Sequence, residues 1–498
     1  MLIAHDLGTT GNKASLHDER GRLLEAVTVE YPAHFADGGI AEQDPDDWYD
    51  AVITATSRLL TKAEVDRASV HGMVISGQMM GAVLLDETHR PVRPAIIWAD
   101  TRAGRQAALL NERLGEHEAY RLHGHRINST YSLAKVMWVR DNEPETFARV
   151  RHVCVAKDYV VHRLTGRLAT DRSDASSTNA YDIGRGAWSA ETLAAAELDP
   201  ALFPEIVESI EVVGSLTQDA ASATGLPAST RVVMGGGDGP IAAVGAGVVA
   251  PEDGAYIAMG TSSWISFASG EPVLDPSMRT FTFEHVVPGL YVPTATMQAA
   301  GASVAWINEI LSPDPSGASL RELVGRASTE DADTGGLFFL PYLFGERSPK
   351  WNTDARGAFV GIGRHHERQH MMRAVLEGVA FNLAECLDAY ADNGYAFDSI
   401  DAVGGGAASD AWLQIMADVW GVQVHRRSVV GEANSLGAAV VGLVGLGLAD
   451  DFSPARELSD VVAAFEPNLQ RHERYRERLE RFRGAYDALE PWMNEEVR

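Results

Sequence analysis

Two short stretches decide the fold class of this chain: Asp6-Leu7-Gly8-Thr9-Thr10-Gly11-Asn12-Lys13 near its start and Gly260-Thr261-Ser262-Ser263 in its middle. Each stretch contains a turn that follows a short apolar run and precedes another apolar segment, which predicts a β-hairpin in both places. The first glycines of the two turns lie 252 residues apart (260 − 8), about half of the 498-residue chain. This spacing indicates an internal duplication, with one such turn in each half.

A second repeated feature supports the duplication. Val232-Val233-Met234-Gly235-Gly236-Gly237 and Ala402-Val403-Gly404-Gly405-Gly406 both predict a strand, a triple glycine and then a helix. From turn to triple glycine the first half takes 227 residues (235 − 8) and the second takes 144 (404 − 260). We therefore expect an inserted region that determines specificity in the N-terminal half.

The composition is that of a globular α/β protein. Apolar runs bounded by glycine alternate with longer helix-like segments, and the length predicts two or three domains. The formal net charge is −27, from 42 Lys and Arg against 69 Asp and Glu. Nucleic acids and anionic membranes attract basic surfaces, so we expect neither as a partner. Small-molecule chemistry is the expected class of function.

Two further features indicate a cytoplasmic protein. The sequence has two cysteines, Cys154 and Cys386, which is too few for a disulfide framework. The N-terminus reaches Asp6 without a basic segment or a long apolar run, so we expect no signal peptide. The least polar stretch, residues 232–250, contains six glycines and Pro240, too broken for a membrane helix.

The turns and their neighbours predict phosphate chemistry. Backbone N–H groups in Gly-Thr turns form concave anion sites, and two facing turns can clamp a polyphosphate. Asp6 precedes the first turn, where its carboxylate can hold a Mg²⁺ that bridges phosphates, and Lys13 follows it. Asp238 follows the first triple glycine, which suits a general base that accepts a proton from an attacking hydroxyl. As alternatives, Asp238 could serve only as a helix N-cap, and an isolated Gly-Thr turn could be a plain hairpin.

These residues resemble the FGGY carbohydrate kinases of the actin, hexokinase and heat-shock-chaperone superfold, and within that family most closely the xylulokinases. The resemblance covers nearly the whole chain. Besides the two turns, it rests on Glu42-Gln43-Asp44-Pro45 with Trp48, Gly77-Gln78-Met79, Trp98 with Asp100 and Arg102, Lys135-Val136-Met137-Trp138, Gly345-Glu346-Arg347-Ser348-Pro349, and Gly357-Ala358-Phe359-Val360-Gly361 through His370 to Glu377.

The resemblance implies an α/β fold of two actin/hexokinase-like (ribonuclease H-like) domains, residues 1–244 and 245–498, flanking a cleft for ATP and a sugar. It also implies roles for matching positions. These are Asp238 as the base; Asp6 at the magnesium; Thr9, Thr10, Lys13, Gly260 and Thr261 around the phosphates; Gly301, Gly405, Gly406 and Asp410 on the nucleoside side; and Gln78, Met79, Met80, Trp98, Asp100 and Trp264 around the sugar.

Three departures from the xylulokinase pattern bear on the identity of the sugar. Met80 stands where xylulokinases usually have His, Gly239 follows the base where Asn or Gln is common, and the residues around Thr130 miss the strict first signature. The resemblance predicts ATP- and Mg²⁺-dependent phosphorylation of a primary hydroxyl of a ketopentose, with D-xylulose as the best single guess.

Two alternatives stay open at this stage. One is a kinase of the same family for ribulose, L-xylulose, a tetrulose or gluconate. The other is a nucleotide-driven binding protein of the actin and heat-shock-chaperone type, which would not phosphorylate a small acceptor. The expected partner is a small sugar, and the sequence leaves a homodimer open.

Two literal motif matches predict nothing further. His366-Glu367-Arg368-Gln369-His370 is an HExxH pattern, but it overlaps a junction between a loop and a helix, whereas a zinc site needs helix around both His residues. Gly245-Ala246-Gly247 loosely matches a dinucleotide fingerprint, but Pro251 ends the helix that would receive a pyrophosphate.

Overall fold

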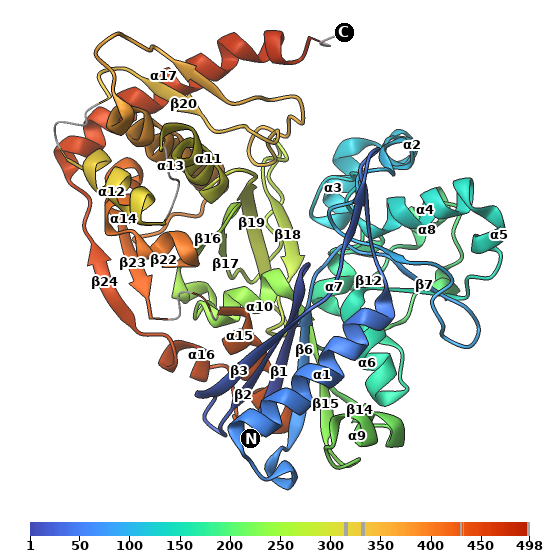
Figure 1. Ribbon diagram of the computed structural model, residues 1–498. Coiled ribbons are helices and arrows are strands. Elements are labelled where there is room, and N and C mark those ends of the chain that lie inside the picture. The colour runs from blue at the N-terminus through green and yellow to red at the C-terminus, as the bar shows by residue number, and fades with distance from the viewer. Residues whose placement is uncertain (313–316, 330–333, 429–430, 432, 496–498) are drawn as a thin grey trace.

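The computed structural model describes residues 1–312, 317–329, 334–428, 431 and 433–495, which form two lobes built on two mixed β-sheets (Figure 1). The first sheet consists of β1 (Leu2–Leu7), β2 (Gly11–His17), β3 (Leu23–Glu30), β6 (Gly72–Gly77), β14 (Val212–Ser215) and β15 (Arg231–Gly237). The second consists of β16 (Ala255–Met259), β17 (Ser263–Phe267), β18 (Phe281–Glu284), β19 (Tyr291–Met297), β22 (Ser399–Val403), β23 (Gln423–Arg427) and β24 (Val461–Phe465).

The two sheets repeat one topology. Their strand orders are β14-β15-β6-β1-β2-β3 and β18-β19-β17-β16-β22-β23-β24, so β3-β2-β1-β6-β15 corresponds to β19-β17-β16-β22-β23. In both, the first hairpin is antiparallel and the next two strands are parallel to its first strand. The predicted hairpins and the internal duplication are confirmed.

The predicted equivalence of the two triple glycines is wrong. Gly235–Gly237 ends β15, the fifth strand of the repeat, whereas Gly404–Gly406 follows β22, the fourth, whose counterpart is β6. Both glycine runs lie where a strand end passes very close to its neighbour. A Cβ at Gly235 would lie 1.8 Å from the Ile75 carbonyl oxygen, and one at Gly404 would lie 2.7 Å from that of Met259. Glycine therefore marks close backbone approach here and not equivalent positions.

The N-terminal half does contain an insertion, residues 78–230 between β6 and β15, although the second half has its own between β19 and β22. The first insertion contains β7 (Val83–Leu85), β8 (Ala95–Ile96), α2 (Gly104–Leu114), α3 (Glu116–His123), α4 (Ser132–Asn142), α5 (Pro144–Phe147), β9 (His152–Cys154), α6 (Ala156–Thr165), β10 (Ala169–Asp171), α7 (Arg172–Ser176), β11 (Tyr181–Asp182), β12 (Ala187–Trp188), α8 (Ala190–Ala195), β13 (Glu205–Val207) and α9 (Gln218–Thr224). Just before α1 (Pro45–Ala63), β4 (His34–Ala36) pairs with β5 (Ile40–Gln43), and β5 pairs with β8.

The C-terminal half packs its helices around the second sheet. They are α11 (Gly301–Leu311), α12 (Gly317–Ala327), α13 (Arg368–Asp392), α14 (Asp410–Trp420) and α17 (Leu469–Met493), with a small hairpin of β20 (Phe338–Leu340) and β21 (Ala358–Val360), whereas α16 (Pro454–Glu457) packs with the first sheet's core. Within these described residues, no helix is both long and apolar enough to span a membrane. Cys154 and Cys386 are both buried.

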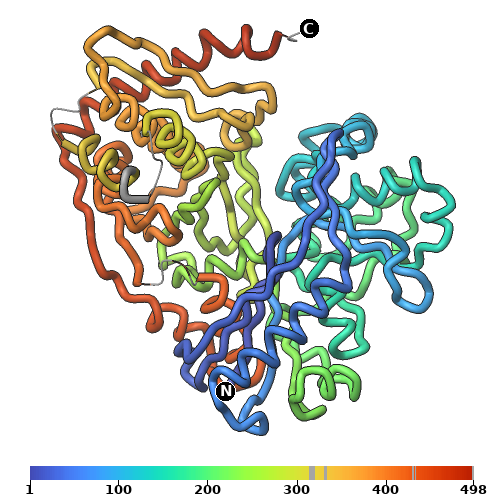
Figure 2. Tube along the Cα trace, in the orientation of Figure 1, coloured from blue at the N-terminus to red at the C-terminus, as the bar shows by residue number. Residues whose placement is uncertain are grey.

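Two helices cross between the halves. α10 (Asp238–Gly245) follows β15 and contacts both sheets: Ala243 packs with β16 and β22 of the second, whereas Ile241 and Val244 pack with the first. α15 (Ala433–Leu446) follows β23 of the second sheet but packs on β1, β6 and β15 of the first, and the tube in Figure 2 brings this late part of the chain beside the N-terminal strands. The helices touch at two glycines: a Cβ at Gly245 would lie 1.8 Å from the Ala433 carbonyl oxygen, and one at Gly437 would lie 2.0 Å from that of Ile241. α15 thus covers one face of the other half's sheet, and α10 lies beside it between the two sheets.

Candidate active site

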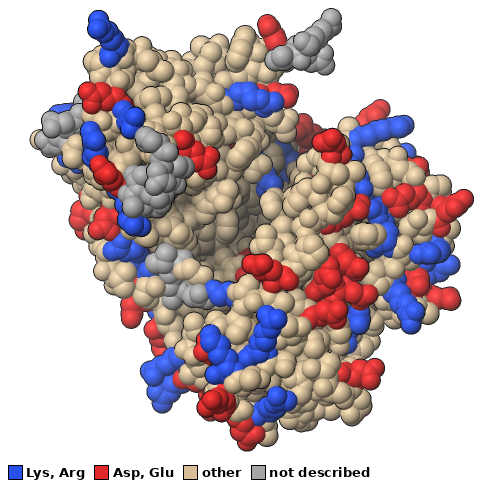
Figure 3. Space-filling view, in the orientation of Figure 1, with Lys and Arg blue, Asp and Glu red and all other residues tan. Residues whose placement is uncertain are grey.

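The surface is deeply hollowed between the two lobes, as the space-filling view in Figure 3 shows. The predicted phosphate, base and nucleoside residues lie on loops that follow β1, β15, β16 and β22, near the crossing helices α10 and α15. Thr10, Gly260 and Thr261, at the tips of the two turns, are exposed.

Side chains hold the first turn from behind. The Tyr31 hydroxyl donates to the Gly8 carbonyl oxygen at 2.5 Å, and the Gln43 amide donates to the Thr9 carbonyl oxygen at 2.8 Å. The Trp98 indole N–H donates to the Thr9 hydroxyl at 2.9 Å. Bonds that occupy these acceptors fix the turn while leaving Thr10 at its exposed tip. Sequence reasoning missed Tyr31, because a tyrosine after a strand carries no motif.

Backbone groups hold the second turn. The amide of Gly301 donates to the Gly260 carbonyl oxygen at 3.0 Å, and the amides of Ala300 and Ala302 both donate to that of Thr261 at 3.0 Å. A Cβ at Gly301 would lie 2.4 Å from the Gly260 oxygen. The turn can therefore rest on the start of α11 only because residue 301 is a glycine.

Asp6 and Lys13 lie directly opposite each other on β1 and β2, so their side chains share one face of the sheet. The Asn434 side-chain amide, from the start of α15, donates to Asp6 Oδ2 at 3.3 Å. Asn434 lies 428 residues from Asp6 along the chain, so no local pattern could have revealed this contact.

Asp238 is half-buried at the first position of α10, and Gly237 occupies the N-cap position. The alternative that Asp238 is the N-cap is therefore wrong. Its Oδ1 accepts from the adjacent Gly239 amide at 2.9 Å. Burial and the negative charge of Asp6 together raise the pKa of Asp238 to about 7. A carboxyl group with that pKa can take up a proton near neutral pH.

The pair Asp6 and Asp238 has the donor chemistry that suits magnesium. Asp6 raises the pKa of Asp238 through its charge, so a cation near them would relieve their repulsion. Within the part of the chain that the structure describes, no group of three or more His, Cys, Asp and Glu is arranged to hold a metal ion. Magnesium in phosphoryl-transfer sites is usually held by one or two carboxylates plus the substrate's phosphates, so a single protein ligand fits.

Two methionines begin the inserted region beside the base. Met79 is buried and would clash with any side chain at Gly237, whose Cβ would lie 2.6 Å from Met79 Sδ. Met80 has a left-handed backbone, φ +63°, and its carbonyl oxygen accepts from Lys135 Nζ at 2.8 Å. Burial lowers the pKa of Lys135 to about 7. The two methionines pack with aromatic residues of both halves, namely Tyr131, Phe281, Phe283 and Trp351.

Gln78 and Asp100 are both buried near the first turn. The Gln78 amide donates to Gln43 Oε1 at 2.8 Å, which links it to the first turn. Asp100 is fully buried, and its carboxylate accepts from the Ala41 amide at 2.7 Å and from Arg102. Asp100 therefore has a supporting position, because both of its carboxylate oxygens accept from protein partners. Gln78 Oε1 has no hydrogen-bond partner within the described residues, so the expectation that Gln78 faces the sugar stays a prediction.

Trp264, on β17, is connected through Tyr256 to Gly239, the residue that follows Asp238. Its indole N–H donates to the Tyr256 hydroxyl at 3.0 Å, and that hydroxyl donates to the Gly239 carbonyl oxygen at 3.4 Å. The chain of contacts places Trp264 near the start of α10, next to Asp238.

The residues predicted for the nucleoside side separate into two groups. Gly406 packs beside the end of β16, where its Cβ would lie 2.9 Å from Met259 Cβ, and Gly405 is exposed with open space around it. Both therefore lie close to the second turn. Asp410 begins α14, is exposed and pairs with Arg426, so it lies at the rim.

The motifs that were set aside have structural roles. α13 begins at Arg368, so His366 precedes the helix and its Nδ1 accepts from the Gly363 amide at 2.8 Å. α10 ends at Gly245, so no helix begins at the loose dinucleotide pattern.

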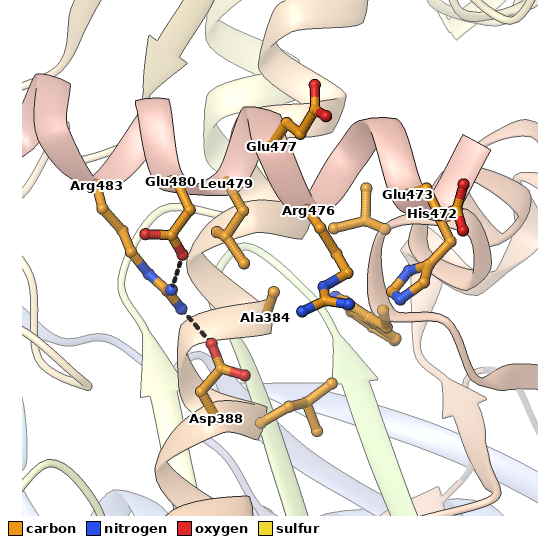
Figure 4. A pocket seen from close by; sticks show the side chains of 12 residues that line it. Ala384, Asp388, His472, Glu473, Arg476, Glu477, Leu479, Glu480 and Arg483 are labelled. Carbon is orange, nitrogen blue, oxygen red and sulfur yellow. Dashed lines mark hydrogen bonds and ion pairs between the residues drawn. The ribbon is translucent and has the colours of Figure 1, made fainter. Parts of the chain in front are cut away.

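A separate surface groove of about 770 Å³ lies between α13, α14 and α17 (Figure 4), where Arg483 pairs with Asp388 and Glu480. It contains none of the predicted site residues.

Comparison with known proteins agrees with this geometry. The chain matches the FGGY family of carbohydrate kinases, the N-terminal domain over residues 1–245 and the C-terminal domain over residues 255–446. It is 31% identical to the xylulose kinase of Bacillus subtilis over 97% of this chain and 96% of the relative, and 29% identical to the gluconokinase of that organism over 92% and 90%. The solved xylulose kinase of Rhodospirillum rubrum is 29% identical, with a TM-score of 0.91 over 99% of both chains.

The duplicated sheets, the two turns and these matches define a two-domain sugar kinase of the actin/hexokinase type. The chain belongs to the FGGY family of carbohydrate kinases. It is therefore an ATP-dependent phosphotransferase with a sugar-type acceptor.

Proposed function

We propose that this kinase transfers the γ-phosphate of ATP to a primary hydroxyl of D-xylulose, giving D-xylulose 5-phosphate, with Asp238 as the general base. The observation that carries the proposal is the half-buried carboxyl of Asp238, with a pKa of about 7, at the tip of β15 beside Asp6 and Met79. The similarity to curated xylulose kinases over nearly the full chain supports this choice of sugar.

In the proposed reaction, Asp238 accepts the hydroxyl proton as the sugar oxygen attacks the γ-phosphate. Thr9, Thr10, Lys13, Gly260 and Thr261 hold the phosphates, while Gly301, Gly405, Gly406 and Asp410 form the nucleoside side. Asp6 would hold a Mg²⁺ ion, which neutralises phosphate charge when bound. Gln78, Met79, Met80, Trp98 and Trp264 line the sugar pocket, with Asp100 supporting it.

The proposed division of labour follows the two sequence-defined domains, residues 1–244 for the sugar and residues 245–498 for the nucleotide. Closure of the lobes over both substrates would exclude water and limit hydrolysis of ATP.

A second candidate acceptor is gluconate, for which a curated gluconokinase relative and Met80 both argue. Met80 cannot donate the hydrogen bonds of the His that xylulokinases usually carry there, so a pocket altered at this position could select another polyol.

The test is ADP release from ATP and Mg²⁺ with a panel of pentuloses, hexuloses, tetruloses, polyols and gluconate, each against a control without sugar. We expect D-xylulose to stimulate turnover at least about a hundredfold. If gluconate alone strongly stimulates turnover, gluconate and not D-xylulose is the acceptor. Steady hydrolysis that no acceptor increases would overturn the proposed reaction.

A further inference from the structure

A buried charged cluster lies directly beneath the loop that carries Asp238. It comes from the inserted region, where β10 and β13 pair in parallel and place Asp171, at the end of β10, near Ser209, just beyond β13. Asp171, Ser173 and Lys157 are fully buried, and Ser209 is 2% exposed. Polar groups withdrawn from water to this extent need specific partners, so their bonds define what the cluster supports.

The first connection to the loop runs through Ser173. Its hydroxyl accepts from the Gly237 amide at 2.9 Å and donates to Asp171 Oδ2 at 2.5 Å. Gly237 immediately precedes Asp238, so this bond fixes the peptide from which the base projects.

The second connection runs through Ser209. Its carbonyl oxygen accepts from the Gly235 amide at 2.9 Å, and its hydroxyl donates to the same Asp171 Oδ2 at 2.7 Å. One carboxylate oxygen therefore joins both ends of the triple glycine.

The cluster is closely fitted to the loop and holds one ammonium group among three carboxyl groups. A Cβ at Gly236 would lie 2.8 Å from Ser173 Oγ and 3.3 Å from Asp171 Oδ2, so the middle glycine rests on the cluster. Lys157 Nζ lies 3.2 Å from Asp171 Oδ1, 2.9 Å from Asp158 Oδ1 and 3.4 Å from Asp174 Oδ2. This ammonium group offsets the charge that burial of Asp171 would otherwise leave uncompensated.

We propose that Asp171 is a positioning residue for phosphoryl transfer, which sets the direction of the Asp238 carboxylate. It holds Gly237 through the Ser173 hydroxyl, and it binds the Ser209 hydroxyl and so fixes the Ser209 carbonyl oxygen that accepts from Gly235. This proposal rests on the proposed role of Asp238 as the base. It gives the inserted region a part in the reaction itself, besides any part in choosing the sugar. A carboxylate displaced by about 1 Å from its reacting hydroxyl loses much of its effect.

The test uses the full-length protein and single hydroxyl deletions, Ser173→Ala and Ser209→Ala, with Ser177→Ala as the matched control. Ser177 lies one residue beyond the end of the same helix, α7, and is as buried as Ser173. Within the described residues, its hydroxyl donates to the Asp174 carbonyl oxygen and to no other group. The readouts are kcat and KM for both substrates, with melting temperatures to compare the loss of stability.

We expect kcat to fall about ten- to a hundredfold in Ser173→Ala and Ser209→Ala, with both KM values within about twofold of the parent protein. The double variant should lose little more than the worse single variant, because both hydroxyls act through one carboxylate. Ser177→Ala should keep kcat within about twofold at a similar melting temperature.

The proposal is overturned if both deletions change kcat no more than Ser177→Ala does, or if their losses fall only in KM. Asp238→Ala, measured in parallel, separates the two levels of inference. Near-normal turnover in Asp238→Ala would show that Asp238 is not the base. If Asp238→Ala is inactive while the serine variants keep their activity, only the positioning role of Asp171 is rejected.

Discussion

The two Gly-Thr turns have related geometry but are held in different ways. In the first, the Gly8 amide donates to the Gly11 carbonyl oxygen at 3.0 Å, and in the second the Gly260 amide donates to that of Ser262 at 2.9 Å. Tyr31, Gln43 and Trp98 hold the first turn by their side chains, whereas the backbone at the start of α11 holds the second.

This difference separates a turn whose position depends on side chains from a turn whose position depends on the backbone. Side-chain supports connect the first turn to Gln78 and Trp98, on the proposed sugar side, so changes in the acceptor pocket can reach the phosphates. Backbone supports make the second turn independent of side-chain identity, apart from the requirement for glycine at residue 301.

The largest expected effect distinguishes the starts of the two crossing helices. Asp238 begins α10, and Asn434 lies at the start of α15, where it donates to Asp6. We expect Asp238→Ala to lower kcat about a thousandfold or more, since it removes the base. Asn434→Ala should lower kcat only about fivefold, the effect of one hydrogen bond. Coupled ADP release measures both, and calorimetry with ADP should show unchanged nucleotide binding in Asp238→Ala. Equal losses in the two variants would contradict this asymmetry.

The second prediction concerns pH. Burial and Asp6 raise the pKa of Asp238 to about 7, and a base must be ionised to accept a proton. Below that value the ionised fraction falls about tenfold per pH unit, so kcat/KM at pH 5 should be about a hundredth of its plateau above pH 8. The measurement is a pH profile of kcat/KM for the sugar, with circular dichroism to check that the protein stays folded at pH 5. A flat profile between pH 5 and 8 would count against Asp238.

Sequence reasoning predicted the elements that depend on local patterns. The two hairpins, the duplicated topology and the position of Asp238 at a strand end follow from glycine, apolar runs and family segments. It failed where contacts join distant positions, as for Tyr31, for Asn434 and for the cluster around Asp171. These residues have no local signature, because only the folded sheets bring them beneath or beside the turns.

Two errors have a common physical cause. The triple glycines were paired because their sequences are alike, yet close approach of the backbone can require glycine at any strand end. Asp100 was assigned to the sugar because it lies in a family segment, yet its carboxylate accepts from Ala41 and Arg102. A motif identifies a neighbourhood, whereas burial and bonding decide which of its side chains face a ligand.

The third prediction tests the backbone support of the second turn. Gly301→Ala places a Cβ about where the Gly260 oxygen lies, at 2.4 Å, so the turn must shift. Strain of about 1–3 kcal/mol should raise KM for ATP about tenfold or more, with a smaller change in KM for the sugar. Gly484→Ala, in α17 with open space around it, is the control and should change neither. An unchanged KM for ATP in Gly301→Ala would show that the turn does not touch the nucleotide.

The smallest expected effect tests the side-chain support of the first turn. Trp98→Phe removes the donor to the Thr9 hydroxyl but keeps an aromatic ring in place. The loss of one partly exposed hydrogen bond should lower kcat/KM for ATP about threefold. Trp492→Phe, in an exposed part of α17, should have no effect. If Trp98→Phe also matches the parent protein, the first turn does not depend on this contact.

The exchange of α10 and α15 between the halves means that neither half is a self-sufficient folding unit. A polypeptide cut after residue 245 would retain the first sheet but lose α15, leaving Leu2, Ala4, Val74 and Val233 of that sheet bare. Bare apolar surface of this kind drives aggregation. Separately produced fragments should thus be insoluble alone and recover a kinase only when synthesised together, so that this enzyme could serve as a split reporter whose reassembly requires both pieces to exchange a helix.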